Sequence, residues 1–306
     1  MGALRAAVLA AAVALAGCGG ASHAHKPTPA PTEPGTLSFT DPVDVAADGH
    51  GALWVADYRD DSLTVVRRDG ARLVAVRRVA AHGGPNRLAA DAQGRIWAAL
   101  WDRGRLAAWE PGRAAPAVVL RVPGMRQPTG LAFDHRGWLW VTTQTGTALL
   151  GFPPQALRRS ATVAPARQVP LPGGRKVLNE DVAFDARDRA YVVQYQAERL
   201  VVLGPVHAAA PAPPLVVKLR GDGPVGIRRG PDGAIWVTNS TAANLLRVTG
   251  GGRRRRVVTT DGANMPHTVT FVGGQAYMTD PTAWVLGYRV GDLEHGTAEP
   301  TLVANP

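Results

Sequence analysis

Along most of the chain, apolar and polar residues alternate in short runs that Gly, Pro, Asn and Asp interrupt. The first complete unit has such runs over 43–47, 53–56, 63–66 and 73–79. Alternation with a period of two predicts strands that bury one face, and the intervening turn residues predict hairpins. This unit therefore predicts four short antiparallel strands.

The same unit recurs six times along the chain. Each copy begins with a turn-forming residue, and a large aromatic residue follows it eleven or twelve positions later. The pairs are Pro42 and Trp54, Pro85 and Trp97, Pro128 and Trp140, Asn179 and Tyr191, Pro224 and Trp236, and Pro266 and Tyr277. The aromatic residues lie 41 to 51 positions apart, a period typical of radial or stacked repeats.

Six units of four strands predict an all-β fold, a six-bladed β-propeller with four antiparallel strands per blade. We expect each repeated aromatic side chain to fill the space between adjacent blades. The sequence does not decide which strand completes the last blade, because either 37–40 or 301–303 has a suitable pattern.

The first 17 residues have the features of a signal peptide: Arg5 near the start, an apolar stretch and no acidic residue. The single cysteine, Cys18, follows Leu-Ala-Gly, which resembles the lipobox of bacterial lipoproteins. That resemblance implies cleavage before Cys18 and lipid on its sulfur. We therefore predict a lipoprotein signal peptide over 1–17, a Pro-rich tether over 18–35 and the propeller over 36–306.

The formal net charge is +10. A basic balance often indicates nucleic acid, but an exported, membrane-tethered protein would not meet it, so we expect no nucleic-acid partner. Anionic lipid or wall polymers fit the predicted location better. The densest basic run is 253–256, whose simplest interpretation is a solvated turn between two outer strands.

One repeat carries a family resemblance most clearly. The segments 223–239 (GPVGIRRGPDGAIWVTN) and 244–249 (NLLRVT) resemble the repeat of virginiamycin B lyase-like proteins. They are also similar to NHL repeats and to the gluconolactonase (senescence marker protein) group. Six units fit the latter two groups better, because the lyase is seven-bladed. Propellers of this superfamily carry many unrelated activities.

Aligning the repeats predicts which positions surround one mouth of the central channel. The residues after the turn residues are Val43, Asn86, Thr129, Glu180, Val225 and His267. The third residues after the aromatic residues are Asp57, Leu100, Thr143, Gln194, Asn239 and Asp280. The predicted ligand-binding residues are Asn86, Thr129, Glu180, Gln194, Asn239, His267 and Asp280.

The resemblance to gluconolactonases implies that the first set holds one divalent cation, Ca or Mg, with Asn86 and Glu180 as its ligands. Asp181 would add an oxygen, but neighbouring residues on a strand point to opposite faces. The resemblance to the lyase implies catalytic roles for His267 and Asp280. That set is incomplete, because Val225 and Met265 stand where the lyase has a His and a Glu.

These observations predict a lipid-anchored monomer on the extracytoplasmic face of the bacterial cell membrane. Its propeller would bind a small molecule or an envelope protein at the channel mouth. No cofactor is predicted other than the one divalent cation, Ca or Mg, that the gluconolactonase resemblance implies. The alternative is a metal-dependent lactonase or virginiamycin B lyase-like C–O lyase at the same mouth. A third interpretation is a structural envelope scaffold, in which the basic faces matter and the mouth does not. Independently of these, the simplest interpretation of His267 is a hydrogen-bonded polar residue rather than a base.

Overall fold

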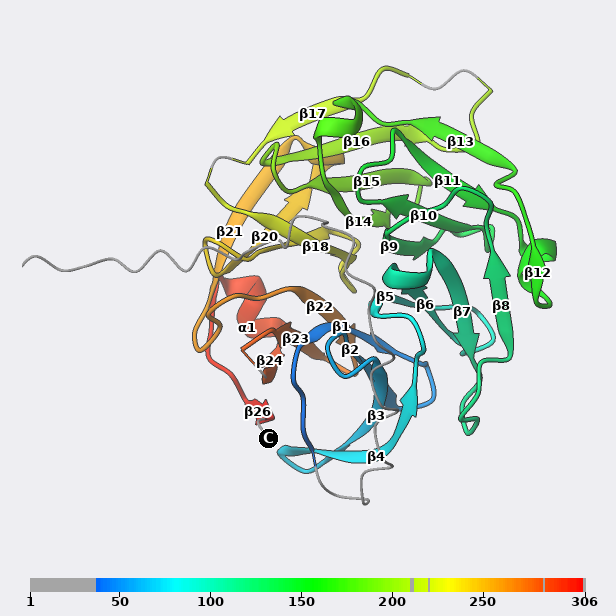
Figure 1. The fold of residues 1–306 in the computed structure, drawn as a ribbon. Helices are drawn as coiled ribbons and strands as arrows, with labels where there is room; N and C mark the ends of the chain where they lie inside the picture. Colours follow the sequence, from blue (N-terminus) through cyan, green and yellow to red (C-terminus); the bar gives the residue numbers. More distant parts are fainter. Residues whose placement is uncertain (1–36, 210–211, 220, 283, 305–306) are drawn as a thin grey trace, which may run out of the picture.

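A computed structural model of the chain describes residues 37–209, 212–219, 221–282 and 284–304. These residues form six sheets arranged in a ring (Figure 1), which confirms the all-β six-bladed propeller. Within them, no helix is long and apolar enough to cross a membrane. The predicted signal peptide, Cys18 and the tether over 18–35 lie outside the described residues.

Within each blade the strands follow the order of the chain, the first being innermost. The first blade comprises β1 (Pro42–Ala47), β2 (Ala52–Asp57), β3 (Ser62–Asp69) and β4 (Arg72–Ala80). The second comprises β5 (Pro85–Ala90), β6 (Ile96–Leu100), β7 (Arg105–Trp109) and β8 (Val118–Arg121). The third comprises β9 (Pro128–Phe133), β10 (Leu139–Thr143), β11 (Ala148–Phe152) and β13 (Arg167–Pro170).

The other three blades repeat this order. The fourth comprises β14 (Asn179–Phe184), β15 (Arg189–Gln194), β16 (Arg199–Pro205) and β17 (Leu215–Lys218). The fifth comprises β18 (Pro224–Arg229), β19 (Ile235–Asn239), β20 (Asn244–Thr249) and β21 (Arg254–Thr260). The sixth comprises β22 (Thr268–Val272), β23 (Gln275–Asp280), β24 (Trp284–Arg289) and β26 (Leu302–Ala304). Short 3₁₀ helices lie at Trp101–Arg103, Gly174–Lys176 and Gly250–Gly252.

Two insertions depart from the regular unit, both between the third and fourth strands of a blade. In the third blade, a 3₁₀ helix (Pro154–Leu157) and β12 (Ala161–Thr162) account for the longest interval between repeated aromatic residues, and β12 pairs in parallel with β8. In the sixth blade, the insertion consists of α1 (Val290–His295) and β25 (Thr297–Ala298), and β25 pairs in parallel with β21. Each insertion thus covers the outer edge of the preceding blade.

The repeated aromatic residues join the blades, as the sequence predicted. Each is at most 3% exposed and packs in one of six apolar clusters that also contain residues of the next blade. Trp54, for example, shares a cluster with Leu88 and Ile96 of the second blade. A large flat side chain at this position buries much apolar area against both sheets.

The C-terminal segment closes the ring. Leu302–Ala304 form β26, which pairs antiparallel with β24, so the chain end rather than 37–40 supplies the fourth strand of the last blade. Tyr277 of this blade packs in a cluster with Val45 and Leu53 of the first, and Phe39 joins the same cluster. The two blades therefore meet through apolar packing, without exchange of a strand.

The hairpin between the first and second strands has a recurring polar anchor. In each of the first four blades an aspartate begins this turn and accepts backbone N–H groups two and four residues later. The turn aspartates are Asp48, Asp91, Asp134 and Asp185. Their second carboxylate oxygen accepts a hydrogen bond from the repeated Trp or Tyr side chain. One residue thus fixes both the turn and the aromatic ring between the blades.

Buried charges fill the centre of the ring, where the first strands converge. Nη2 of Arg228, on β18, lies 2.9 and 2.6 Å from the two carboxylate oxygens of Asp44 on β1. Nη1 of the same side chain lies 2.5 Å from Asp181 Oδ2 on β14. Both carboxylates are fully buried. Burial alone would lower the pKa of Arg228, but the two carboxylates raise it above its ordinary value, so the side chain stays charged.

The same carboxylates bind backbone and hydroxyl groups of further blades. Asp44 accepts hydrogen bonds from the Leu88 amide at 2.6 Å and from Thr268 Oγ1 at 2.6 Å. Asp181 accepts one from the Ile227 amide at 3.1 Å. The charged groups therefore link the first, second, fourth, fifth and sixth blades across the axis.

We predict that Arg228→Met destabilises the fold by about 3–5 kcal/mol, because it leaves the buried Asp44 without its cation and Asp181 with only Arg87, whose Nε lies 3.6 Å away. The matched control is Arg247→Met, which removes the partly exposed Arg247–Asp232 pair, 2.6 Å long, and should cost at most about 1 kcal/mol. Urea unfolding followed by tryptophan fluorescence measures both. Equal losses in the two variants would contradict a central role for Arg228.

Candidate functional site

The candidate site lies at the mouth of the channel, where the six first strands begin. In the first five blades, two residues of the first strand face one residue of the second at this end, which is a β-bulge. In the fourth blade the bulge separates Asn179, paired with Gln194, from Asp181, paired with Val193. Glu180 is the extra residue between them.

The bulge changes which side chains reach the channel. Strict alternation had predicted that Asp181 points away from Glu180. Instead Asp181 belongs to the buried ion pairs on the axis, and its charge also acts on Glu180. The bulge interrupts the period of two at this point, so strict alternation does not decide the faces of these two residues.

Arg87 crosses the mouth and was missed by the sequence analysis. Its Nη2 donates to the Val225 carbonyl at 2.9 Å, and its Nη1 donates to the Asn86 Oδ1 at 2.8 Å. Its Nε has no hydrogen-bond partner among the described residues, although Asp181 Oδ2 lies 3.6 Å away. The side chain is only 2% exposed, so a fixed positive charge lies at the base of the mouth.

Glu180 is half-buried beside this charge. Among the described residues its carboxyl group forms no ion pair and no hydrogen bond. Burial raises its pKa to about 7, which Arg87 opposes and Asp181 reinforces. Near neutral pH this carboxyl therefore exists in both protonation states, as a donor and as an acceptor of hydrogen bonds.

His267 precedes β22 on the other side of Arg87. Burial, together with the charge of Arg87, lowers its pKa to about 3, against a smaller effect of Asp280. The imidazole is therefore neutral at physiological pH. Its buried Nδ1 has no hydrogen-bond partner among the residues that the structure describes.

Three other predicted ligand-binding residues hold the blades and loops together. Thr129 is fully buried and donates from Oγ1 to the Asn179 carbonyl at 2.9 Å. Gln194 donates to the Pro172 carbonyl and to Asn179 Oδ1, and accepts from Arg199 Nε. Asn239 donates to Asn244 Oδ1, while its own buried Oδ1 has no partner in the described structure.

Asp280, predicted as a catalytic residue, anchors the loop that leads into β22. Its Oδ2 accepts from the amides of Asn264 and Met265, both at 2.8 Å, and its Oδ1 accepts from the amide and hydroxyl of Thr282. Asp57 occupies the equivalent position in the first blade and holds the backbone of Thr40 and Asp41 in the same way. These contacts occupy the carboxylate, which affects His267 only through its charge.

The predicted cation ligands Asn86 and Glu180 are both near enough to Arg87 to interact with its charge. A Ca or Mg ion would need the Asn86 Oδ1, but this oxygen already accepts from the Arg87 guanidinium. That fixed positive charge also acts directly on Glu180. The residues present therefore do not fit a divalent cation at this position, since its donors are shared with a permanent cation.

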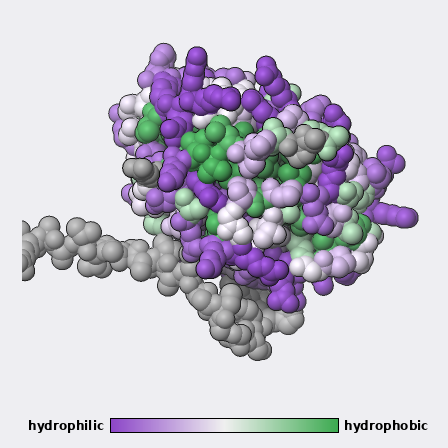
Figure 2. All heavy atoms as spheres, turned by 90° about the horizontal axis from the view of Figure 1, so that it is seen from above, coloured by the Kyte–Doolittle hydropathy of each residue, from purple (hydrophilic) through white to green (hydrophobic). Residues whose placement is uncertain are grey.

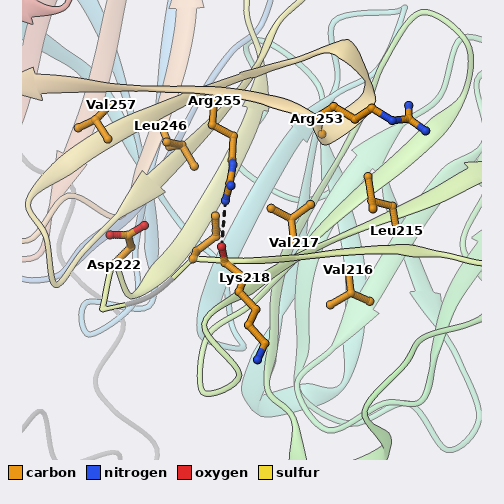
Figure 3. A pocket seen from close by; sticks show the side chains of 11 residues that line it. Leu215, Val216, Val217, Lys218, Asp222, Leu246, Arg253, Arg255 and Val257 are labelled. Carbon is orange, nitrogen blue, oxygen red and sulfur yellow. Dashed lines mark hydrogen bonds between the residues drawn. The ribbon is translucent and has the colours of Figure 1, made fainter.

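A groove lies on the outer rim, between β17 and β21. This rim groove, about 830 Å³ in volume, is lined by Leu215, Val216 and Val217 from one side and by Arg253, Arg255 and Val257 from the other (Figure 3). Arg255 Nη1 donates across it to the Lys218 carbonyl at 2.9 Å. Figure 2 looks down on the rim that carries β17 and shows an apolar area bordered by hydrophilic side chains.

The basic run 253–256 is exposed to solvent, as its simplest interpretation predicted. The turn itself falls on Gly250–Gly252, and most of the run belongs to the outer strand β21. The run thus places guanidinium groups next to the exposed apolar side chains of the rim groove.

Comparison with known proteins identifies relatives of the fold. No family model and no curated protein sequence matches the chain. Among solved structures, a streptogramin B lyase shares 15% identity with a TM-score of 0.66, over 90% of this chain and 87% of the other. Virginiamycin B lyase from Staphylococcus aureus shares 15% with a TM-score of 0.61, over 84% and 85%.

A gluconolactonase from Xanthomonas campestris shares 18% identity with a TM-score of 0.57, over 80% of this chain and 84% of the other. The six-bladed propeller thus has structural neighbours in two of the three groups that the repeat resembles, the lyases and the gluconolactonases. At this level of identity the likeness concerns the fold, because propellers with one architecture carry different activities.

Proposed function

We propose that this protein is an extracytoplasmic lipoprotein whose propeller binds a small polar molecule at the channel mouth. The observation that carries the proposal is the set of unsatisfied polar groups around Arg87. Glu180 has no hydrogen bond in the described structure, and the buried His267 Nδ1 has none either. A buried polar atom without a partner, such as His267 Nδ1, is costly, and a ligand with matching groups would satisfy it and hydrogen-bond the half-buried Glu180 as well.

The charges restrict the class of ligand. Arg87 supplies a fixed positive charge, His267 a neutral imidazole, and Glu180 a carboxyl group that gains or loses a proton near pH 7. A hydroxy acid or its lactone offers hydroxyl and carbonyl groups for all three residues. The fold shared with a gluconolactonase supports this choice of chemistry.

We predict that ligands of this class bind in a Glu180- and His267-dependent manner. Calorimetric titration with gluconate and glucono-1,5-lactone, and with other small hydroxy acids, should reveal a ligand whose affinity falls at least about tenfold in Glu180→Gln and in His267→Ala. Glu110→Gln, at an exposed carboxylate on the outside of the second blade, is the control. Ligands whose affinity survives both substitutions would count against this site.

The protonation of Glu180 gives a second prediction. Its folded-state pKa, about 7, lies above the ordinary value of 4.5, so its stabilising contribution is complete below pH 4.5 and is lost as the pH rises through 7. Relative to wild type, Glu180→Gln should therefore gain up to about 3 kcal/mol in free energy of unfolding between pH 4.5 and 8. Urea unfolding across this range measures it, and a difference that does not change with pH would refute it.

The alternative function is a lactonase or C–O lyase at the same mouth. Proton transfer would then fall to Glu180, because a pKa near 7 suits a general acid or base and the lowered pKa of His267 does not. The titrations above distinguish the two functions when the products are analysed. Turnover that Glu180→Gln abolishes would favour the enzyme, and binding without turnover favours the binding protein.

The location rests on Cys18 and on the exposed basic run. Two or three acyl chains at Cys18 would anchor the protein stably, and the arginines of β21 would face anionic lipid or wall polymers. We predict that Cys18→Ser abolishes labelling by radioactive palmitate and releases the protein from the membrane fraction. Undiminished labelling would contradict lipid attachment at this residue.

A further inference from the structure

A cluster of metal-ligating side chains lies at the opposite end of the strands from the channel mouth, between the third and fourth blades. It consists of Asp134 in the β9–β10 turn, Asp188 in the β14–β15 turn and His207 after β16. One potential ligand atom from each lies within 4.8 Å of the others. The three side chains are 0%, 4% and 7% exposed.

The other blades show what this turn looks like without the cluster. In the second and fourth blades, the turn aspartates Asp91 and Asp185 pair with an arginine four residues later, at 2.7 and 2.6 Å. In the third blade Trp138 stands at that position, and Asp134 pairs instead with His207 Nε2 at 2.6 Å. An imidazole of the neighbouring blade has replaced a guanidinium. A guanidinium cannot bind a metal ion, whereas an imidazole is a common ligand.

Asp188 is the second departure from the repeat. The equivalent turn position is glycine in the other four blades with this turn, with φ between 74° and 90° at Gly51, Gly94, Gly137 and Gly233. Asp188 adopts φ 55°, a left-handed conformation that aspartate enters more readily than most non-glycine residues. It places a buried carboxylate near that of Asp134. Arg136 Nε lies 3.6 Å from Asp188 Oδ2, but this guanidinium is 56% exposed and offsets only part of the repulsion between the two carboxylates.

A fourth potential ligand lies at the edge of the cluster. His135 Nδ1 contacts Asp188 Oδ1, and its side chain is 59% exposed, so it is free to adjust. Trp138 and Trp140 pack edge-on against the His207 ring, with centroids 5.1 and 5.7 Å away, and fix its orientation. Two imidazoles and two carboxylates suit a tetrahedral Zn²⁺ ion.

We propose that Asp134, Asp188 and His207, with His135, form a binding site for a divalent transition metal such as Zn²⁺ between the third and fourth blades. The site is distinct from the channel mouth and does not depend on the function proposed there. Its metal would join the two blades at the end of the strands where Arg228 does not reach. The role that fits a buried site of this kind is structural.

Two substitutions test the site without removing the fold. Asp188→Gly restores the residue of the other repeats and relieves the positive φ. His207→Gln keeps a donor for Asp134 but is a poor metal ligand. Both are made in a His23→Ala/His25→Ala background of the full mature chain, because the tether histidines would bind zinc weakly. His50→Ala, in the corresponding turn of the first blade, is the control.

After dialysis against a chelator, calorimetric titration with ZnCl₂ and metal analysis should give one Zn²⁺ per chain in the background protein and in the His50→Ala control. Asp188→Gly and His207→Gln should each weaken zinc binding at least about tenfold. Zinc should also raise the thermal midpoint of the background protein but not of these two variants. Failure to bind stoichiometric zinc, or zinc binding that both substitutions leave unchanged, would overturn the proposal. The cluster would then be only two histidine–carboxylate pairs, His207 with Asp134 and His135 with Asp188.

Discussion

Closing six blades into a ring brings six first strands to a common axis, and the structure depends on how the side chains there are accommodated. Arg228 forms hydrogen-bonded ion pairs with Asp44 and Asp181, which lie on two different first strands, and so joins these strands at the axis. Glycines leave the necessary room, since a Cβ on Gly226 would lie 2.1 Å from the His267 carbonyl oxygen. The buried charges thus fix both the distance and the rotation of the blades about the axis, and thereby position the mouth above them.

The repeat allowed the fold to be predicted because its signals are local. A turn residue, an alternating run and an aromatic residue recur in each unit, and each acts within its own blade and the next. Trp54, Trp97 and Trp140 therefore behave alike, packing against the following blade with at most 1% exposure. The closing strand was undecided from the sequence because 37–40 and 301–303 have similar patterns, and only the pairing of Leu302–Ala304 with β24 distinguishes them.

The candidate site was predictable only in part, for a physical reason. Aligning the repeats led to Asn86, Glu180 and His267. In the structure Arg87 donates a hydrogen bond to Asn86, and its charge lowers the pKa of both Glu180 and His267. Arg87 itself was not predicted, because strict alternation assigns the residue after Asn86 to the other face. The β-bulge that reverses this depends on pairing between strands and leaves no clear sign in one unit. A signal did exist: the second position after the turn residue is charged in three units, as Asp44, Arg87 and Asp181.

The two ends of the strands use the same scaffold differently. At the mouth, residues that vary between repeats surround a fixed positive charge, which favours polar or anionic ligands over a cation. At the other end, the first four blades share a turn aspartate, and its arginine partner in the second and fourth blades is replaced by His207 in the third. Asp188 of the fourth blade stands where the other turns have glycine. Both changes add a metal ligand, and Asp188 does so at a position where glycine would be unstrained. The proposed metal ion would give both departures a single purpose, because His207 and Asp188 would each supply one of its ligands.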